Sequence, residues 1–239
     1  MSKEAIGESL RSTAEMTKNK ALLLLSGGQD SFTLFYWAKK QFASIEALSF
    51  NYGQRHLVEL EAAKELCEAH EVPHSILELS CLKQISKNAL VNSEREISLK
   101  GDYQGLPSTF VPGRNALFLT LGASYALPRS INEIVIGACE TDYSGYPDCR
   151  EEFIASMEQS LSLAMANELK IHRPLMFMDK AQTFAMASEL EVLDDVIKKS
   201  HTCYKGTRDV LQEWGYGCGE CPACVLRKNG FKEFKGEVK

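Results

Sequence analysis

The stretch ALLLLSGGQDSFTLFYWA (residues 21–38) decides the fold. Its first five residues form a short, continuous apolar run, which indicates a buried strand. An apolar helical pattern begins at Phe32, so we predict a helix over residues 31–42. The glycines and serines between the strand and the helix exceed what a turn requires, which makes this loop a candidate binding site.

The pattern downstream extends this unit into a parallel sheet. A second strand is predicted at 45–50, a helix at 57–70 and a third strand at 74–79. Strands that alternate with helices at this spacing imply right-handed crossovers and parallel pairing. Further apolar patterns predict helices at 115–127, 151–169 and 180–190 and strands at 133–138 and 170–174. The predicted fold class is therefore α/β, an open, mostly parallel sheet with helices on both faces.

The composition is ordinary for a soluble globular protein. The 239 residues suit one large domain, or one domain with a small appendix, and 44% of them are hydrophobic. The formal net charge of -5 is opposite in sign to that of most proteins that bind a phosphate backbone, so no nucleic acid partner is expected. The apolar run at 21–25 is too short for a secretory signal, and no stretch reaches the length of a membrane span. We therefore expect a cytoplasmic protein.

The loop at residues 26–31 has the chemistry of an anion site. It follows the carboxyl end of a predicted parallel strand and opens a helix, where backbone N–H groups attract anions. Gly27 and Gly28 let an anion approach the main chain. The hydroxyls of Ser26 and Ser31 add donors, whereas Asp30 needs a metal ion or another cation beside a phosphate. The loop has neither the lysine of a Walker motif nor the spacing of the dinucleotide fingerprint, which excludes two familiar phosphate loops.

Four of the eight cysteines are grouped near the end of the chain. Cys203 precedes a CxxCxxC run that consists of Cys218, Cys221 and Cys224. In a reducing compartment this grouping favours a metal over disulfides. Four thiolates suit tetrahedral zinc, with iron–sulfur binding as the alternative. A closed four-thiolate site has no open position for a substrate, so we predict a structural role, and we interpret His201 as a packed or surface residue.

Further polar side chains lie at predicted strand and helix ends. Tyr52, Gln54 and Arg55 follow the second strand, where a nucleotide or a base could lie. Arg114 begins an apolar helix. It is either a solvated arginine beside an Asn115 N-cap or a guanidinium for a phosphate or a carboxylate.

One further residue and one polar loop suggest ligand contacts. Lys180 stands at a helix start, where a cation opposes the helix dipole unless it meets an anion. A polar loop at 139–150 carries carboxylates and phenols, namely Glu140, Asp142, Tyr143, Tyr146 and Asp148. This loop is either a solvated acidic loop or a site for a base, because carboxylates accept from base N–H groups and aromatic rings stack on bases.

The sequence SGGQDS (26–31) resembles the pyrophosphate-binding loop of the adenylating ATP pyrophosphatases. Five further blocks are FNYGQRH (50–56), TFVPGRN (109–115), CETDYSGYPDCR (139–150), PLMFMDKAQT (174–183) and CGECPACVLRKNGF (218–231). Together, and in this order, the blocks resemble the 7-cyano-7-deazaguanine synthase family of queuosine biosynthesis. The resemblance covers about residues 21–234, so nothing carries over to residues 1–20.

This resemblance implies a Rossmann-like fold of the adenine nucleotide hydrolase type with a small C-terminal zinc module. We divide the chain into a polar tail (1–20), an ATP-binding α/β domain (21–199) and a zinc module with a helix (200–239). The implied catalytic residues are Arg114, Lys180 and Asp30. ATP with Mg²⁺ is assigned to Leu25, Ser26, Gly27, Gly28, Gln29, Asp30, Ser31, Tyr52, Gln54 and Arg114. Substrate is assigned to Glu140, Asp142, Tyr143, Tyr146 and Asp148, and one zinc ion to the four grouped cysteines.

The implied activity is that of an ATP-dependent carbon–nitrogen ligase. A 7-carboxy-7-deazaguanine carboxylate is activated by ATP, ammonia gives an amide, and a second ATP activates the amide oxygen so that its loss leaves the nitrile. The chain shows no glutaminase arrangement, so free ammonia is the expected source, and the family leads us to expect a homodimer. The alternative is a related adenylating enzyme that acts on tRNA by thiolation or base modification.

Overall fold

The computed structural model describes residues 17–54, 57–85, 89–90, 97, 106–141 and 145–237. The strands of its main sheet are β1 (Thr17–Leu24), β2 (Phe42–Asn51), β3 (His74–Glu78), β4 (Glu133–Val135) and β5 (Lys170–His172). The α-helices are α2 (Gln29–Gln41), α3 (Val58–Ala69), α4 (Leu82–Ile85), α5 (Arg114–Ala126), α6 (Glu151–Met165), α7 (Lys180–Glu189), α8 (Leu193–Lys199) and α9 (Pro222–Phe234). Arg55, Asp142 and Tyr143, which the sequence assigned to the site, lie outside the described residues.

The five strands form one parallel sheet in the order β3-β2-β1-β4-β5, with β1 at its centre. Leu23 of β1 lies opposite Ala47 of β2 on one side and Val135 of β4 on the other. The chain order reverses direction at β1, and this is the place where open α/β sheets bind ligands. The predicted parallel sheet is confirmed.

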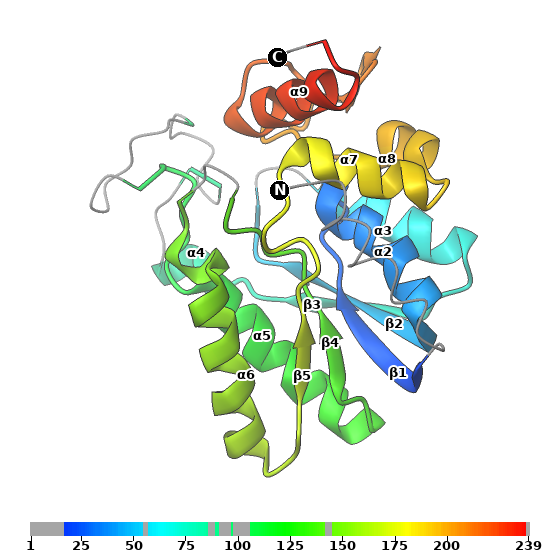
Figure 1. Cartoon of the computed structure of the whole chain (residues 1–239). Coiled ribbons are helices and arrows are strands. Elements are labelled where there is room, and N and C mark those ends of the chain that lie inside the picture. Colours follow the sequence, from blue (N-terminus) through cyan, green and yellow to red (C-terminus); the bar gives the residue numbers. More distant parts are fainter. Residues whose placement is uncertain are drawn as a thin grey trace.

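Side chains of β1 alternate between two cores. Leu23 and Leu25 pack with Phe32 on the face covered by α2, α3, α7 and α8. Leu22 and Leu24 pack on the opposite face, which α5 and α6 cover (Figure 1). Because successive residues of a strand point to opposite faces, a continuous apolar run is what a strand buried on both faces requires. The prediction of helices on both faces is confirmed.

The first strand begins earlier than predicted. The sequence placed residues 17–20 in a polar tail, but β1 starts at Thr17. Polar side chains at this end find partners on the neighbouring strands. Lys20 forms an ion pair with Glu46 of β2, and Asn19 Nδ2 donates to Glu133 Oε1 of β4 over 2.8 Å. These contacts extend the strand beyond its apolar run.

Other boundaries differ in ways that the backbone explains. The predicted helix at 151–169 ends at Met165, because Ala166 adopts a left-handed φ of 48°. The strand predicted at 133–138 ends at Val135, and the one predicted at 170–174 ends at His172. Helix α8 was not predicted. It contributes Val196 to the first core and carries mostly charged residues elsewhere, so it shows little apolar periodicity.

The C-terminal segment packs on the sheet domain through α7 and α9 (Figure 1). The rings of Phe184 on α7 and Phe231 on α9 lie with their centroids 5.2 Å apart. A Cβ added to Gly230 would lie 2.3 Å from Lys180 Cβ, so the two helices approach as closely as a glycine allows. A short hairpin of β6 (Leu211–Gln212) and β7 (Gly215–Tyr216) completes the segment. The expected helix of the C-terminal module is confirmed as α9.

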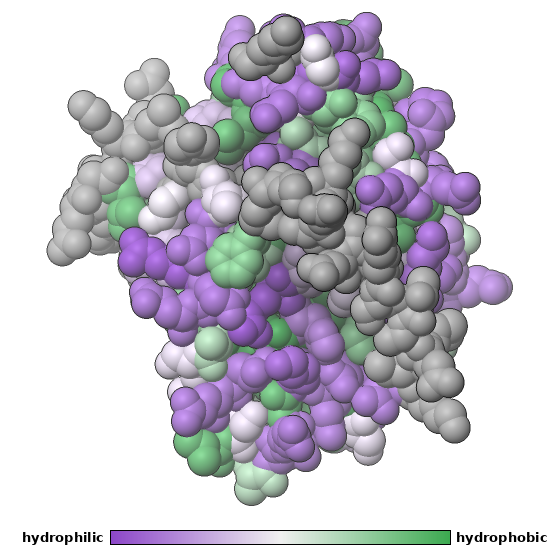
Figure 2. Space-filling model, in the orientation of Figure 1, coloured by the Kyte–Doolittle hydropathy of each residue, from purple (hydrophilic) through white to green (hydrophobic). Residues whose placement is uncertain are grey.

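The face drawn in Figure 2 is largely hydrophilic where its residues are described, and apolar residues form separate small groups on it. Among the described residues, no helix is long and apolar enough to span a bilayer.

Substitution of Gly27 by alanine is expected to destabilise the fold. Gly27 has φ +89°, and an added Cβ would lie 1.9 Å from the carbonyl oxygen of Glu59 on α3. A backbone clash combined with a left-handed φ costs about 2 kcal/mol or more, which lowers the melting temperature by about 5 °C or more in a chain of this size.

The matched control is Gly28→Ala. Gly28 has an extended backbone (φ -74°, ψ 165°), and the nearest atom to an added Cβ is Ser26 Oγ at 3.4 Å. Thermal unfolding of both variants checks the prediction, and equal melting temperatures for Gly27→Ala and Gly28→Ala would contradict it.

Candidate nucleotide pocket and metal centre

The serines of the 26–31 loop hold the loop's own main chain. Ser31 Oγ accepts from the N–H groups of Ser26 (3.2 Å) and Gly27 (3.1 Å). Ser26 Oγ accepts from Gly28 N over 3.2 Å and lies 3.0 Å from Ser31 Oγ. The two hydroxyls therefore fix the turn between β1 and α2. Both serines also line the cavity described below.

Asp30 meets a cation. Its Oδ2 accepts from Lys180 Nζ over 2.7 Å, and both side chains are largely shielded from solvent. Lys180 is the first residue of α7, which Asp179 and Gln182 cap in a reciprocal capping box. Asp30 is thus the anion that a lysine at a helix start needs. The other carboxylate oxygen, Oδ1, is buried and has no hydrogen-bond partner among the described residues.

Gln29 carries a second unsatisfied group in the same loop. Its side chain is 1% exposed, and neither amide atom has a hydrogen-bond partner within the described ranges. Buried amides without a partner are rare, because losing water without compensation costs about 1–3 kcal/mol. Together with Asp30 Oδ1, this amide indicates that the loop is built to meet a ligand.

The loop forms one wall of a cavity of about 290 Å³. The opposite walls come from the end of β2, the start of α5, the segment after β4 and the segment 202–204. Of the residues that the sequence assigned to the nucleotide, those that line the cavity are Leu25, Ser26, Gly28, Gln29, Asp30, Ser31, Tyr52, Gln54 and Arg114. The volume is at the lower end of the range for small-molecule sites.

Arg114 projects into an aromatic enclosure. Its guanidinium carbon lies 5.9 Å from the ring centroid of Tyr52 and 6.0 Å from those of Phe118 and Tyr146. Burial lowers the pKa of Arg114, but Tyr52 and Tyr146 raise it, and the net pKa is above the usual value. The arginine is charged and only partly exposed, so its interpretation as a solvated surface residue is wrong.

The N-cap that this alternative assigned to Asn115 is also wrong. Gly113 is the N-cap of α5, with a left-handed φ of 68° and ψ of 17°, and Asn115 is the second residue of the helix. Asn115 N donates instead to Asp148 Oδ2 over 2.9 Å, and Asn115 Nδ2 donates to the carbonyl of Asp148. The carboxylate of Asp148 therefore satisfies the helix end beside Arg114.

The predicted substrate residues separate in the structure. Tyr146 lies near Arg114, with its hydroxyl 2.5 Å from Thr109 Oγ1. Asp148 lies beside them but is 7% exposed and bonded to Asn115. Glu140 is exposed and accepts from Glu151 N at the start of α6. Contact of these three residues with a base stays a prediction.

Three further residues line the cavity that no sequence motif pointed to as site residues, namely Glu59, Thr202 and Tyr204. Burial raises the pKa of Glu59 to about 7, against the influence of Arg114. Burial also raises the pKa of Tyr204, whose hydroxyl interacts with Tyr146. Tyr204 follows directly after a grouped cysteine, and that adjacency was the available signal. Thr202 directly precedes the same cysteine and carried the same signal, whereas Glu59 has none.

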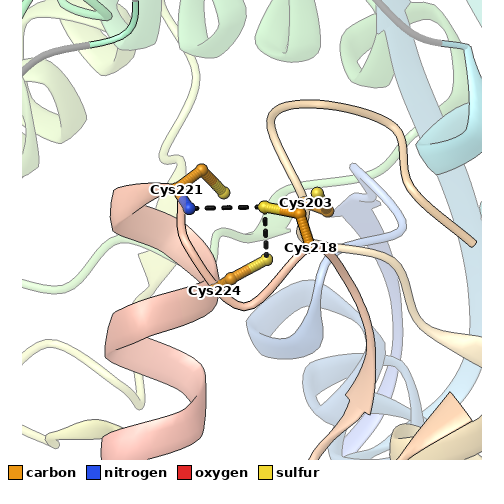
Figure 3. A group of neighbouring side chains, drawn as sticks. All are labelled: Cys203, Cys218, Cys221 and Cys224. Carbon is orange, nitrogen blue, oxygen red and sulfur yellow. Dashed lines mark hydrogen bonds between the residues drawn. The ribbon is translucent and has the colours of Figure 1, made fainter. Parts of the chain in front are cut away.

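The four grouped cysteines converge. Cys203, Cys218, Cys221 and Cys224 place their sulfur atoms within 4.8 Å of one another (Figure 3). A Zn–S bond of about 2.3 Å puts the sulfurs of a tetrahedral site about 3.8 Å apart, and Cys218 Sγ lies 3.9 Å from Cys224 Sγ. The sulfurs that bind a cubane cluster stand further apart, because each binds a different iron. The predicted metal ligands are therefore brought together in a geometry that fits a single ion.

The surroundings of the cluster also suit a metal. Cys218 Sγ accepts from Cys221 N over 3.3 Å and from Glu220 N over 3.5 Å, as thiolate ligands do. Hydrogen bonding by Cys221 and Cys224 lowers the pKa of Cys203, whereas the pKa of Cys221 is raised to about 11. Four thiols this close ionise together only beside a cation. His201 is fully buried and stands outside the sulfur cluster, so its interpretation as a packed residue is confirmed.

The parallel sheet, the loop at its carboxyl edge and the cysteine cluster define an α/β protein whose fold is of the adenine nucleotide hydrolase type. The model of the family described as queuosine biosynthesis protein QueC matches residues 20–235. The chain belongs to this family.

Curated relatives agree with this placement. A 7-cyano-7-deazaguanine synthase from Clostridium acetobutylicum is 47% identical over 220 residues, which cover 92% of this chain and 96% of the relative. One from Helicobacter pylori is 46% identical over 225 residues, covering 93% of this chain and 99% of the relative. The family that the sequence blocks predicted is confirmed.

A solved structure supports the fold. The U34-tRNA thiolase NcsA from Methanococcus maripaludis, solved with its [4Fe-4S] cluster, aligns with a TM-score of 0.52. The alignment covers 98% of this chain and 77% of the thiolase at 17% identity. At this identity the similarity concerns the arrangement of strands and helices and leaves ligand and substrate open.

Substitution of Cys221 by serine is expected to remove the metal and to lower stability, because one of four ligands is lost and metal binding is coupled to folding. We expect less than one equivalent of metal and a melting temperature lower by about 10 °C or more. Elemental analysis and thermal unfolding measure both quantities. Cys81→Ser is the control, since Cys81 is exposed and stands outside the cluster. A Cys221→Ser protein with full metal content and unchanged melting would contradict the assignment.

Proposed function

We propose that this protein converts 7-carboxy-7-deazaguanine and ammonia into 7-cyano-7-deazaguanine with two molecules of ATP. The observation that carries the proposal is the cavity beside the 26–31 loop, in a chain 47% identical to a synthase of that name. The loop has the anion-binding position of an open parallel sheet, and Arg114 faces it across the cavity.

ATP binds in this proposal with its β- and γ-phosphates at the loop. Asp30 holds a magnesium ion through Oδ1, which has no protein partner among the described residues, while Oδ2 keeps its ion pair with Lys180. Magnesium takes one or two carboxylates together with phosphate oxygens, so a single buried carboxylate oxygen beside a phosphate loop fits it. Lys180 then offsets the charge that develops as pyrophosphate leaves.

The substrate lies on the Arg114 side of the cavity. A guanidinium between aromatic rings suits a planar heterocycle that carries a carboxylate, because it offers ionic contact and a stacking surface together. Tyr52 and Tyr146 flank this guanidinium. We assign them to the heterocycle, with Asp148 holding the helix start that presents Arg114.

Two oxygens of the carboxylate must leave for a nitrile to form. Attack of the carboxylate on the α-phosphate of ATP makes an acyl adenylate and releases pyrophosphate. Ammonia displaces AMP and gives the amide. Attack of the amide oxygen on a second ATP again releases pyrophosphate, and loss of AMP together with the N–H protons leaves the C–N triple bond. The chain's contribution is positioning and charge stabilisation in this cavity.

The metal in this proposal is zinc, bound by the four cysteines in a structural role. A four-sulfur site is coordinatively closed, so it supplies no position for the substrate. Free ammonia, a homodimeric state and a cytoplasmic location complete the proposal, and the homodimer rests on the family relationship alone. The alternative of tRNA modification lacks support from the charge balance, which is -5 for the chain.

The proposed reaction predicts nitrile formation from purified components. The metal-loaded protein with ATP, magnesium, ammonia and 7-carboxy-7-deazaguanine should yield 7-cyano-7-deazaguanine by mass spectrometry, with two AMP per nitrile. Omission of ammonia should stop the sequence before the amide. A folded, metal-loaded protein that makes neither amide nor nitrile would falsify the proposal.

Lys180→Met is expected to reduce kcat/KM for ATP by about 100-fold, because it removes the charge next to Asp30 and keeps the length of the side chain. Lys198→Met is the matched control, since Lys198 pairs with Asp194 on the exposed face of α8. Steady-state kinetics with pyrophosphate release as the readout separates the two variants. Equal rates for Lys180→Met and Lys198→Met would exclude the assigned role of Lys180.

A further inference from the structure

Segment 201–204 links the phosphate loop to the metal centre. His201 N donates to Gly27 O over 2.9 Å, and Gln29 N donates to Thr202 Oγ1 over 3.2 Å. The next residue, Cys203, belongs to the cysteine cluster. The position of Thr202 is therefore fixed by the loop on one side and by the cluster on the other.

A second donor, on α9, reaches the same hydroxyl oxygen of Thr202. Arg227 on α9 has no exposed surface, and its Nη1 donates to Thr202 Oγ1 over 3.2 Å. Its Nε donates to the carbonyl of Trp214 and its Nη2 to that of Val196. Gly215 leaves the space for this guanidinium, since an added Cβ would lie 2.3 Å from Arg227 Nη2. These contacts hold the Arg227 guanidinium in one position, so its Nη1 points at Thr202 Oγ1.

These two contacts determine where the hydroxyl hydrogen points. A hydroxyl oxygen has two acceptor lone pairs and one hydrogen to donate. A backbone N–H and a guanidinium N–H can only donate, so Gln29 and Arg227 occupy both lone pairs of Thr202. The hydrogen of Thr202 must therefore point elsewhere, and none of the residues described in the structure accepts it. Thr202 lines the cavity beside the 26–31 loop.

We propose that Thr202 is a phosphate-binding residue whose hydroxyl, oriented by Arg227 and Gln29, donates to an oxygen of the polyphosphate held by the 26–31 loop. The proposal deepens the proposed function and rests on its placement of ATP at this loop. A polyphosphate oxygen is the complementary acceptor, because it is anionic and lies in this proposal beside a helix start that favours anions, with Arg114 in the same cavity. The metal centre then fixes one wall of the nucleotide site.

Equilibrium binding of pyrophosphate and of ATP tests this role without turnover. Thr202→Val keeps the shape and removes the hydroxyl, whereas Thr202→Ser keeps the hydroxyl. We expect Thr202→Val to bind both ligands about tenfold or more weakly and Thr202→Ser to stay within about threefold of the unaltered protein, since a hydrogen bond to a charged group is lost only in the first. Adenosine, which has no phosphate, should bind both variants equally.

Thr120→Val is the matched control, because Thr120 is exposed and its hydroxyl donates to Ala116 O within α5, its one partner among the residues the structure describes. Metal content and melting temperature are measured for every variant, and Thr202→Ala replaces Thr202→Val if the latter does not fold. Unchanged pyrophosphate binding by Thr202→Val overturns the proposal. Equal weakening by Thr202→Ser overturns it too, as does equal weakening for adenosine. A protein that shows the expected pattern but makes no nitrile would contradict the proposed reaction and leave the Thr202 assignment standing.

Discussion

The site depends on the backbone of Gly27, which meets two other parts of the chain at once. No Cβ fits between it and the carbonyl of Glu59 on α3, and its own carbonyl accepts from His201 N. One residue therefore brings the end of β1, the start of α3 and the segment before Cys203 into contact. A larger side chain would separate α3 from the loop, and the walls of the cavity would no longer face one another. The close approach at Gly27 defines the pocket, and the residues that carry charge are arranged around it.

The pocket contains charges of both signs, since Asp30 and Glu59 line it together with Arg114. The protein has a net charge of -5, yet Arg114, Lys180 and Arg227 all stand at or behind the cavity. Lys180 is neutralised by Asp30, and Arg227 is bonded to backbone carbonyls and Thr202. Within a shielded site, such charges act on an anion much more strongly than the distant surface charges, which solvent and salt screen. A negatively charged protein can therefore bind a polyphosphate, and this is why the net charge argued against a nucleic acid partner but not against a nucleotide.

Features set by short stretches of sequence were predictable, and features set by tertiary contact were not. The apolar run before SGGQDS predicted a strand buried on both faces, because the pattern itself states which faces are apolar. The cysteine spacing predicted four metal ligands, because three of them lie close together in a CxxCxxC run. Residues 17–20 were assigned to a tail, because their partners, Glu46 and Glu133, lie on other strands and leave no local signal. Thr202 contacts Gln29 across 173 positions of sequence, and no periodicity or motif in a single sequence reports such a distance.

The cysteine cluster matters for the cavity because residues next to its ligands line that cavity. An ion held by all four sulfurs would have no open position with which to bind or activate a substrate. Its influence on the pocket must pass through the residues that flank its ligands. Thr202 and Tyr204 stand on either side of Cys203 and both line the cavity, while α9 follows Cys221 and carries Arg227 to Thr202 and Gly230 to Lys180. A closed metal site at these cysteines would thus organise the neighbouring cavity by fixing the side chains next to its ligands.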